Sequence, residues 1–552
     1  MVSRRRRQSK LFIRWFLVLM IDRILHYTVP TMSWAGTPAP AQFFHQQLLD
    51  HTESKSRTFW TQRYYTWEDE FQGPGHPILL ILGGEGNIEP STGLVYPFVT
   101  HHLAKDFGAF VLQPEHRFYG RSQPLKSKTT IKSGKIAMRN GDVFPHMSGI
   151  DPRVRYLTPY QALSDAMRLL TYYQRRLGCS SNRSDFENYC PVITIGGSYP
   201  GWLSAMARLL FPNQVDIAYA ASAPMKFYSQ QLASSDLYYQ HITTVAERAY
   251  PGCANQVRTT LRMVQTILLE LPNRDVTSAA VALGFCPSSI PSYIQTMTHL
   301  SEELMMIIAY TFANDNMAYY PPDNTTQLYQ SCKIFASIRE DPFRIVSHFL
   351  RFHFVDANEK FQHSSKNCVR MSEQLPSGPN ATISSGDWSG VGSGPSGESW
   401  DFQTCTLLVE AIGFSDITTM FPSRPWTINW LNQHCQQRFG VTPEPYRLVK
   451  EWHFDDFVGS TNASHILFTN GLNDGWSVGA ITQNLSDTLI SLNFENGAHH
   501  SDLSGQGPSD RDTPDIIEGF SKIRNLLSKW LNEIQPIKYP LRKKTELIKV
   551  VT

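Results

Sequence analysis

Short apolar runs alternate with longer amphipathic stretches in the first and last parts of the chain. The runs at residues 76–82, 110–113, 192–195, 215–221, 465–469 and 488–494 are rich in β-branched and aliphatic side chains, which predicts buried strands. After Thr158-Pro159, apolar residues recur at helical spacing up to Leu170, so a long amphipathic helix is expected there. This alternation predicts a parallel α/β sheet whose functional loops lie at the carboxyl ends of the strands.

The pattern changes between residues 225 and 398. Helical periodicity dominates, with the longest stretches at 255–271 and 290–313, and strand signals are few. The end of this region, residues 375–399, is rich in Gly, Ser and Pro and is predicted to be a loop. These features predict a mainly helical insertion within the α/β unit.

A candidate nucleophile follows the predicted strand 192–195. The sequence Gly196-Gly197-Ser198-Tyr199-Pro200-Gly201 leads from that strand into residues 202–210, which have the composition of a buried helix. A serine at a glycine-lined turn between strand and helix is typical of a nucleophile elbow, in which the hydroxyl stands above the sheet edge. The positive end of the helix dipole then favours a developing oxyanion. A plain Gly-Ser loop is the alternative interpretation of this segment alone.

Two further residues supply the partners that such a serine needs. Asp474 follows the predicted strand 465–469, and His499 follows the predicted strand 488–494. An isolated Asp in a turn is usually a turn former, and an isolated His is usually structural. Here the order Ser, Asp, His, each after a strand, is that of an α/β-hydrolase. The sequence therefore predicts Ser198 as nucleophile, His499 as general base, and Asp474 as the carboxylate that orients the imidazole.

A domain plan follows from the helical insertion and the order of the triad. The fold class expected is α/β, an α/β-hydrolase fold with an inserted, mainly helical cap domain. We expect residues 1–40 to be a signal peptide or signal-anchor, 41–224 the first part of the core, 225–398 the cap, 399–535 the second part of the core, and 536–552 a basic tail.

Several ordered motifs resemble one family of serine peptidases. They are Gly-Gly-Ser-Tyr-x-Gly at 196–201, Asn-Gly-x-x-Asp-x-Trp at 470–476, Gly-Ala-His-His-x-Asp-Leu at 497–503, and the segments 46–51, 83–87, 115–122, 400–406 and 420–422. Together they resemble the family that includes prolyl carboxypeptidase, dipeptidyl peptidase II and thymus-specific serine protease, from about residue 43 to about residue 530. The resemblance implies an exopeptidase that hydrolyses peptide bonds next to proline through an acyl-enzyme, either as a carboxypeptidase or as a dipeptidyl peptidase.

The resemblance also implies roles for individual residues. His499, the first of two adjacent histidines, is the base. The oxyanion hole is expected to consist of the backbone N–H of Tyr199 and, by its position in the glycine loop, that of Gly84. An aromatic and apolar pocket for proline is expected, although each candidate could equally be a core residue. The candidates are Trp476, Trp400, Phe402, Met420 and Phe421.

This chain departs from the family pattern at two positions. Pro200 stands two residues after the nucleophile, where a small residue is usual, but proline suits the first turn of a helix because its missing N–H would have no partner there. Leu407 stands where many members have Glu directly after Cys-Thr. A carboxylate at that position, which could hold a substrate amino group, is therefore missing.

The chain has eight cysteines and no Cys-x-x-Cys pair, which argues against a zinc site or thioredoxin chemistry. Spacing alone does not give the pairing of these cysteines. The family resemblance implies the disulfides Cys253–Cys332, Cys286–Cys368 and Cys405–Cys435. Cys179 and Cys190 would then form a fourth disulfide, closing a short loop before the nucleophile strand, with a free thiol at either position as the alternative.

The N-terminus and the sequons predict entry into the secretory pathway. Four arginines at 4–7 precede an apolar stretch centred on residues 15–21, which resembles a signal peptide, and charges at 14, 22 and 23 make it short for a membrane span. A signal-anchor is the alternative. Five Asn-x-Ser/Thr sequons predict glycosylation, at Asn182, Asn324, Asn380, Asn462 and Asn484. We expect a secreted protein or one of the endosomal or lysosomal lumen.

Composition adds little to this prediction but excludes some classes. The formal net charge is +2 over 552 residues with Lys and Arg dispersed, which gives no support for nucleic-acid binding. The loop Gly83–Asn87 could cradle a phosphate, but it lacks the Gly-Lys-Ser/Thr ending of a P-loop. No cofactor or metal is expected, the partners are peptides, and a homodimer is compatible with the sequence. A lipase or esterase on the same scaffold and a catalytically inactive binding protein are the competing functions.

Overall fold

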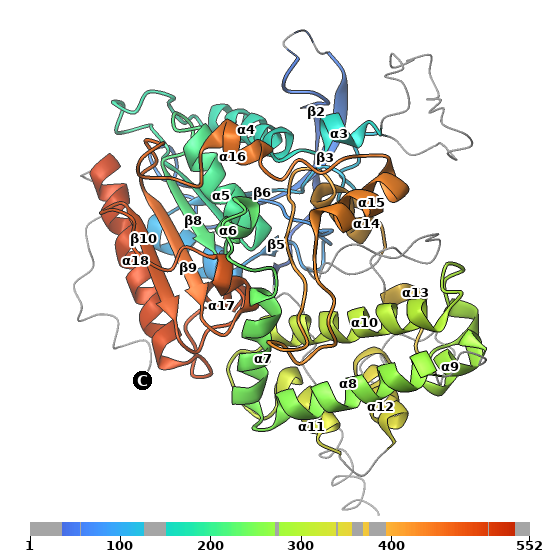
Figure 1. Cartoon of the computed structure of the whole chain (residues 1–552). Coiled ribbons are helices and arrows are strands. Elements are labelled where there is room, and N and C mark those ends of the chain that lie inside the picture. Colours follow the sequence, from blue (N-terminus) through green and yellow to red (C-terminus); the bar gives the residue numbers. More distant parts are fainter. Residues whose placement is uncertain are drawn as a thin grey trace, which may run out of the picture.

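The computed structural model describes residues 36–53, 55, 57–125, 151–270, 275–337, 341–355, 368–374, 394–505 and 507–535. A large twisted sheet with helices on both sides forms one part of the molecule, and a group of helices from the middle of the sequence forms the other (Figure 1). Residues 1–35 of the leader predicted at 1–40, most of the Gly/Ser/Pro-rich loop and the basic tail lie outside the described residues.

The main sheet contains eight strands in the order β10-β9-β8-β7-β4-β6-β3-β2. The strands are β2 Gln42–Leu48, β3 Phe59–Trp67, β4 Ile78–Ile81, β6 Phe110–Pro114, β7 Val192–Gly197, β8 Ile217–Ala221, β9 Ile466–Gly471 and β10 Leu489–Phe494. A second, two-stranded sheet pairs β1 Gly36–Thr37 with β5 Leu94–Val95. Six neighbouring strands are parallel to one another, in the order β10, β9, β8, β7, β4 and β6.

The expectation of a wholly parallel sheet is wrong at one edge. β2 and β3 run antiparallel to each other, and β3 runs antiparallel to β6. The short connection between β2 and β3 forces this direction, because a short link joins antiparallel neighbours whereas parallel strands need a crossover. The fold is therefore a mixed sheet of the α/β-hydrolase kind.

Alternate residues of the central strands enter two different cores. Ile78 and Leu80 of β4 pack with Trp202 on one face, while Leu79 and Ile81 pack with Phe520 on the other. All four β4 residues are fully buried, because helices cover both faces of the sheet. The covering helices are α4 Pro159–Arg176 and α5 Tyr199–Leu210 on the first face and η1 Val99–Leu103, α2 Ala104–Phe107 and α18 Pro514–Ile534 on the second.

A helical region follows β8. It contains α6 Met225–Tyr228, α7 Leu237–Ala249, α8 Cys253–Glu270, α9 Val276–Ala282, η2 Pro287–Ser289, α10 Met297–Met317, α11 Gln327–Phe335, α12 Pro342–Phe354 and α13 Met371–Gln374. The start predicted for α10 at residue 290 is wrong, because Thr296 caps the helix with its side chain on the N–H of His299. Two disulfides, Cys253–Cys332 and Cys286–Cys368, join parts of this region.

The remaining elements of the fold are short, and a long loop joins two of them. The short elements are α14 Gly394–Thr404, α15 Ile428–Phe439, α16 Arg447–Trp452, η4 Gly475–Gly479 and α17 Ser501–Ser504, with α3 Arg153–Tyr156 earlier in the chain. Between α14 and α15 a loop reaches across to the helical region (Figure 1), where the N–H of Met420 donates to Thr243 and Arg258 donates to the carbonyl of Thr419. The loop between α14 and α15 is thus hydrogen-bonded to α7 and α8.

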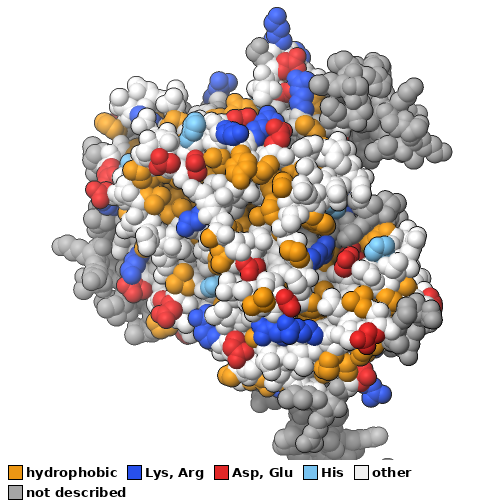
Figure 2. Space-filling view, in the orientation of Figure 1, with side chains coloured by type: hydrophobic (Ala, Val, Ile, Leu, Met, Phe, Trp, Pro, Cys, Tyr) orange, Lys and Arg blue, Asp and Glu red, His pale blue; other side chains and the backbone are white. Residues whose placement is uncertain are grey.

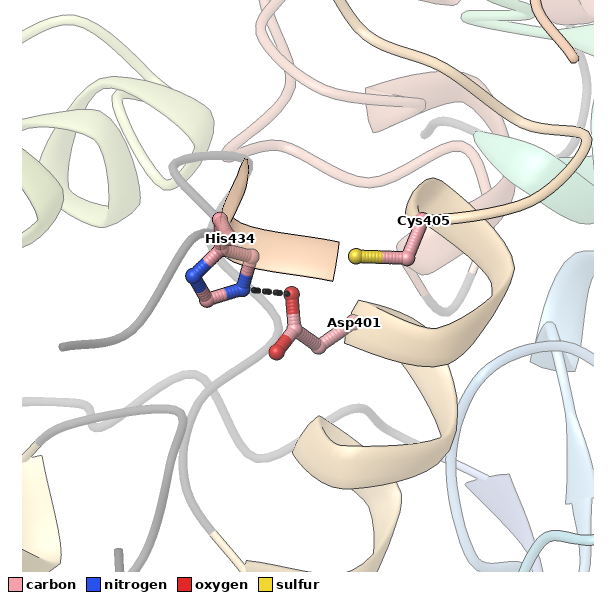
Figure 3. Close-up of side chains that lie close together, drawn as sticks. All are labelled: Asp401, Cys405 and His434. Atoms are coloured by element: carbon pink, nitrogen blue, oxygen red, sulfur yellow. Dashed lines mark ion pairs between the residues drawn. The ribbon is translucent and has the colours of Figure 1, made fainter. Parts of the chain in front are cut away.

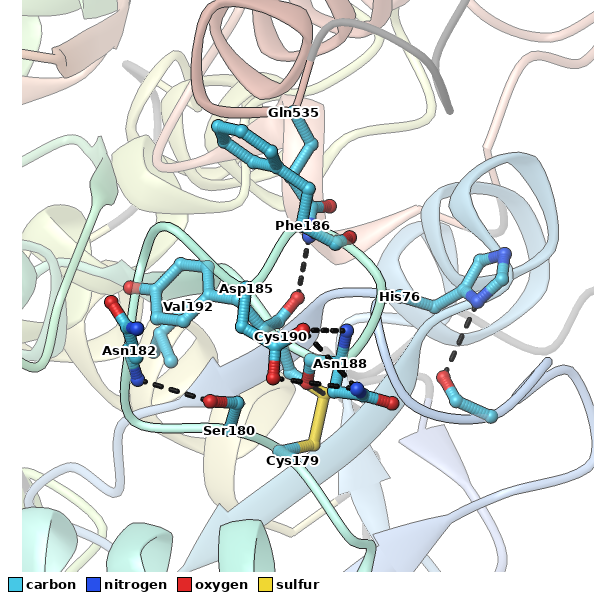
Figure 4. The surroundings of a disulfide bond; sticks show 12 residues. His76, Cys179, Ser180, Asn182, Asp185, Phe186, Asn188, Cys190, Val192 and Gln535 are labelled. Carbon is cyan, nitrogen blue, oxygen red and sulfur yellow. Dashed lines mark hydrogen bonds between the residues drawn. A yellow bond between two sulfur atoms is a disulfide. The ribbon is translucent and has the colours of Figure 1, made fainter.

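The loop that precedes the nucleophile strand is closed by the disulfide Cys179–Cys190 (Figure 4). Gln535, just after α18, donates hydrogen bonds to the carbonyls of Phe186 and Tyr189 in this loop, at 3.1 and 2.6 Å. Three of the four disulfides are those that the family resemblance implies, and the fourth is the expected bond between Cys179 and Cys190; the described cysteines are all bonded.

Charged side chains of both signs are interspersed over the described part of the face in Figure 2, in keeping with the small net charge. Within the described residues, no helix combines the length and the apolar character that crossing a membrane requires.

Candidate active site

The turn after β7 holds Ser198 in a backbone conformation that few residues adopt. Its φ is 65° and its ψ is −131°, and α5 begins at the next residue. A positive φ at a non-glycine residue is costly and is found mainly at functional sites. The loop carrying the two histidines packs closely here, because a Cβ on Gly197 would come within 2.8 Å of the His500 ring. The serine therefore stands at a strained turn beside the histidine loop.

Asp474 and His499 form a buried pair. Asp474 follows β9 and His499 follows β10, and the Nδ1 of His499 lies 2.6 Å from Oδ2 of Asp474. Their side chains are 1% and 4% exposed. The other carboxylate oxygen of Asp474 accepts from the N–H of Trp476 at 3.1 Å. With a carboxylate as acceptor, Nδ1 carries the proton, and the opposite nitrogen of the ring is left as the basic one.

The loop that carries Asp474 is also hydrogen-bonded to the loop that carries His499. The N–H of Asn473 donates to the carbonyl of Gly497 at 2.9 Å. His500 is anchored separately, because its N–H donates to the Ser222 hydroxyl and its Nδ1 lies 2.6 Å from the Ser504 hydroxyl. Burial and the adjacent His499 lower the pKa of His500 well below its usual value, so it stays neutral. Its contacts are those of a residue that supports the loop.

The predicted oxyanion hole lies where the glycine loop meets the start of α5. The first N–H groups of a helix have no intrahelical partner, so the N–H of Tyr199 is available to a ligand. Gly84 faces the ring of Pro200, whose Cγ would be only 2.6 Å from a Cβ placed on Gly84. The two predicted donors therefore come from segments that are in contact.

A polar network holds the Tyr199 side chain. Its hydroxyl lies 3.1 Å from Nε2 of His116 and accepts from Nε2 of Gln403 at 3.2 Å, while Tyr119 donates to the same glutamine at 2.6 Å. Burial lowers the pKa of His116 to about 4. Nδ1 of this neutral ring lies 2.6 Å from the carbonyl of Arg117 and donates to it, so Nε2 accepts from Tyr199. The role of His116 in this network was not predicted from its motif.

The segments 46–51 and 115–122, which carry the family resemblance, prove to be structural. Arg117 pairs with Asp165, and Nε2 of His51 lies 2.7 Å from the same carboxylate. Glu115 pairs with Arg63 and accepts from the Ser122 hydroxyl at 2.7 Å. These buried ion pairs fix the strand edge next to the glycine loop.

The five candidate pocket residues have different surroundings. Trp476 packs against Phe227 and Tyr238, with its ring centroid 6.5 Å from that of His499, and Trp400 packs edge-on against Tyr199 at 5.2 Å. The other three candidates are fully buried in packing clusters: Phe402 against Phe439, and Met420 and Phe421 within the core of the helical region. Trp476 and Trp400 thus adjoin the site, while the contacts of the other three are those of core residues.

Glu85, next to Gly84, is an acidic group that the sequence did not single out. Burial raises the pKa of its carboxyl group above the ordinary value, and the nearby His499 opposes this shift. A second acid, Glu410, accepts from the hydroxyl of Tyr228 at 3.1 Å and is 9% exposed. It lies three residues beyond Leu407, the position where the family pattern has Glu.

One cluster in the described residues has the residue types of a metal site. Asp401, Cys405 and His434 lie close together (Figure 3). The sulfur of Cys405 is bonded to Cys435, however, and is no thiolate. Asp401 already pairs with Arg438 at 2.7 Å and with His434 at 3.5 Å. The donor set does not fit a metal, and the cluster joins α14 to α15.

A mixed sheet with a serine turn after β7, an acid after β9 and a histidine after β10 defines the class as α/β hydrolase. The chain belongs to the serine carboxypeptidase S28 family, whose model matches residues 47–519. It is therefore a serine-type peptidase with peptides as its substrates.

The relatives are similar along most of their length. Lysosomal Pro-X carboxypeptidase of Pongo abelii is 27% identical over 92% of this chain and 91% of its own, and the Homo sapiens protein of the same name is 27% identical over 86% of each. Thymus-specific serine protease of Mus musculus is 26% identical over 90% of this chain and 88% of its own. Among solved structures, the match to a Pyrococcus horikoshii acylaminoacyl peptidase covers 35% of this chain and 25% of that chain at 12% identity, with a TM-score of 0.23.

Proposed function

We propose that this peptidase is a secretory-pathway exopeptidase that cleaves peptide bonds next to proline, with Ser198, Asp474 and His499 as its triad. The observation that carries the proposal is the buried Asp474–His499 pair at 2.6 Å beside the strained turn of Ser198. The family and the relatives named for Pro-X carboxypeptidase activity support the substrate.

In this mechanism His499 takes the proton of Ser198 as the hydroxyl oxygen attacks the peptide carbonyl. Asp474 holds the imidazole in the right tautomer and stabilises the imidazolium that forms. The N–H groups of Tyr199 and Gly84 donate to the oxyanion, and His499 returns the proton to the leaving amine. Water, activated by the same histidine, then releases the acyl-enzyme. Removal of one oxyanion donor commonly costs about 3 kcal/mol of transition-state stabilisation.

The position of the aromatic residues supports a proline pocket. Trp476 is on the loop of the catalytic acid and packs against Phe227 and Tyr238, and Trp400 packs against Tyr199 next to the nucleophile. A flat apolar ring packs well on aromatic faces. In this proposal the helical region between β8 and β9 acts as the cap, which restricts access to the ends of peptides.

The test is hydrolysis of two peptide sets at pH 5 and pH 7.5. One set is Xaa-Pro-reporter with a free amine, and the other is N-blocked Xaa-Pro-Xaa with a free carboxylate. Cleavage of the first alone identifies a dipeptidyl peptidase, and cleavage of the second alone a prolyl carboxypeptidase. Cleavage of neither set overturns the substrate assignment.

Ser198→Ala tests the nucleophile, with Ser204→Ala as the matched control. Ser204 lies on α5, and its hydroxyl donates to the carbonyl of Thr194 at 2.9 Å, so its loss affects packing. We expect Ser198→Ala to lose hydrolysis and labelling by a fluorophosphonate, and Ser204→Ala to keep both. Equal activity of wild type and Ser198→Ala would remove Ser198 as the nucleophile.

The secretory route is tested by glycosidase treatment of protein from a eukaryotic host. Four of the sequon asparagines, Asn182, Asn324, Asn462 and Asn484, are exposed, as the modification requires, and Asn380 lies outside the described residues. A loss of mass on treatment is expected. An unchanged mass together with free thiols would contradict the secretory assignment.

A further inference from the structure

The longest helix of the helical region ends against the two loops that carry the catalytic acid and base. α10 runs from Met297 to Met317, and its last residues contact the chain around Asp474 and around His499. Resting on the triad proposed above, we propose that Asn316 and Met317 are positioning residues for Asp474 and His499. The helical region then completes the active site in addition to covering it.

Asn316 binds the backbone on both sides of the catalytic acid. Its Nδ2 donates to the carbonyl of Asn473 at 2.8 Å, and its Oδ1 accepts from the N–H of Gly475 at 2.8 Å. The side chain is fully buried, so neither hydrogen bond competes with water. One amide group thus fixes the orientation of the two peptide units between which the Cα of Asp474 lies.

Met317 binds the base loop and the pocket with two different atoms. Its carbonyl oxygen accepts from the N–H of His499 at 3.2 Å, and its Sδ accepts from Nε1 of Trp476 at 3.4 Å. Because Asn316 and Met317 are consecutive, a movement of the end of α10 changes the acid and the base together. The distance between Asp474 and His499 therefore depends on where this helix ends.

The end of α10 is itself anchored inside the helical region. The carboxyl group of Asp315 accepts from the Ser331 hydroxyl at 2.5 Å, and this hydroxyl lies 2.8 Å from Nε2 of His353. Ser331 is on α11 and His353 on α12, so three helices meet at the residue before Asn316. Burial raises the pKa of Asp315 to about 8 and lowers that of His353 to about 3, so this cluster is uncharged at neutral pH.

The expected effect follows from the role of a supporting hydrogen bond. Loss of such an outer partner of a catalytic group typically costs about 10–100-fold in activity, because the group it orients is still present but held less well. Asn316→Leu removes both hydrogen bonds at similar side-chain size. We expect kcat to fall about 10–100-fold with KM within about twofold of wild type, since the substrate contacts remain.

Asn314→Leu is the matched control. Asn314 is on the same helix and makes no side-chain hydrogen bond to any residue that the structure describes. We expect wild-type kcat for this variant. The pH profile separates positioning from general weakening: in Asn316→Leu the acid limb of the kcat/KM profile moves to lower pH, because a less well placed carboxylate stabilises the imidazolium less. A purely structural defect lowers the whole profile without moving it.

A second substitution keeps the test decisive if Asn316→Leu does not fold. Asn316→Ala also removes both hydrogen bonds, and its smaller side chain avoids the bulk of Leu and adds no charge to the buried site. We expect it to lose kcat and to shift the acid limb in the same direction. Unchanged kcat and an unmoved acid limb in a folded Asn316 variant would overturn the positioning role. Ser198→Ala separates this result from the triad itself, since activity in Ser198→Ala contradicts the proposed function whatever Asn316 does.

Discussion

Replacement of Gly84 by Ala tests the oxyanion hole at the contact between the glycine loop and Pro200. A Cβ at this position would lie 2.6 Å from Cγ and 3.2 Å from Cδ of Pro200. The backbone of Gly84 is not in the left-handed region, so the substitution brings no conformational strain of its own. Its effect therefore comes from the contact between the glycine loop and the first turn of α5.

The size of the displacement follows from the contact distance. Two carbon atoms approach favourably at about 3.5 Å, so the loop and the proline must separate by close to 1 Å. A misplacement of about 1 Å can cost about 100-fold in rate, and loss of one oxyanion donor costs about 100–1,000-fold. We expect Gly84→Ala to lower kcat by about 100-fold, with KM little changed.

The assay is hydrolysis of the preferred proline peptide by the wild type and four variants, all at equal folded content. Gly86→Ala is the control in the same loop, because nothing lies within 4 Å of a Cβ built there. The double variant Gly84→Ala/Pro200→Ala removes the ring atoms that the new methyl group meets, and Pro200→Ala alone completes the cycle. We expect Gly86→Ala to keep wild-type kcat and the double variant to recover most of the loss.

Three results would refute this reasoning. Wild-type kcat in Gly84→Ala would show that the N–H of Gly84 is not a donor to the oxyanion. An equal loss in Gly86→Ala would show that the loop tolerates no substitution, in which case the Pro200 contact explains nothing. Failure of the double variant to recover, with Pro200→Ala active, would also contradict the contact argument.

Three further predictions concern stability. Burial raises the pKa of Asp315 to about 8 from its ordinary 3.8, so the stability gained from its neutral form is complete below about pH 4 and is lost as the pH rises to 8. We therefore expect the melting temperature of Asp315→Asn to rise increasingly above that of the wild type from pH 5 to pH 8. A constant difference in melting temperature over this range would contradict the prediction. Tyr199→Phe leaves two buried partners unsatisfied and should lose about 1–3 kcal/mol by urea unfolding while keeping the backbone donor; a larger loss of kcat than of stability would give the hydroxyl a catalytic role. Cys179→Ser with Cys190→Ser should lose about 3 kcal/mol, because the disulfide closes a loop with a separation of 11 residues, and an unchanged melting temperature under non-reducing conditions would contradict this.

Much of the site could be predicted because its chemistry is local in sequence. Ser198, Asp474 and His499 each follow an apolar run that forms a strand, and strands predicted from such runs lie within a few residues of β4, β6, β7, β8, β9 and β10. The antiparallel edge was missed because residues 46–51 were interpreted as a motif, and the mixture of Gln, Phe and His in residues 42–48 has no clean alternation. The boundary of α10 was missed although Thr296 is a good N-cap residue.

The remaining features depend on contacts between residues far apart in the chain. Asn316 meets Gly475 across 159 positions and Gln403 meets Tyr199 across 204, and no local pattern marks either residue. Phe402 and Trp400 are both aromatic and belong to the same motif, so the sequence treats them alike. The sequence could not show that one packs against Tyr199 while the other packs against Phe439. Packing direction decides this, and a single sequence contains little information about it.

The amide of Asn316 matters for anyone who wishes to redesign this enzyme. Exchanging the helices between β8 and β9 with those of a relative, or trimming them to admit longer peptides, is an obvious route to new specificity. Such a graft divides a hydrogen-bonded unit whose acceptor and donor, the carbonyl of Asn473 and the N–H of Gly475, stay behind with the sheet. A transplant therefore has to present an amide at the same point, and a deletion leaves two buried backbone groups without partners beside the acid. The helices and the Asp474 loop that Asn316 binds are therefore best exchanged as one unit.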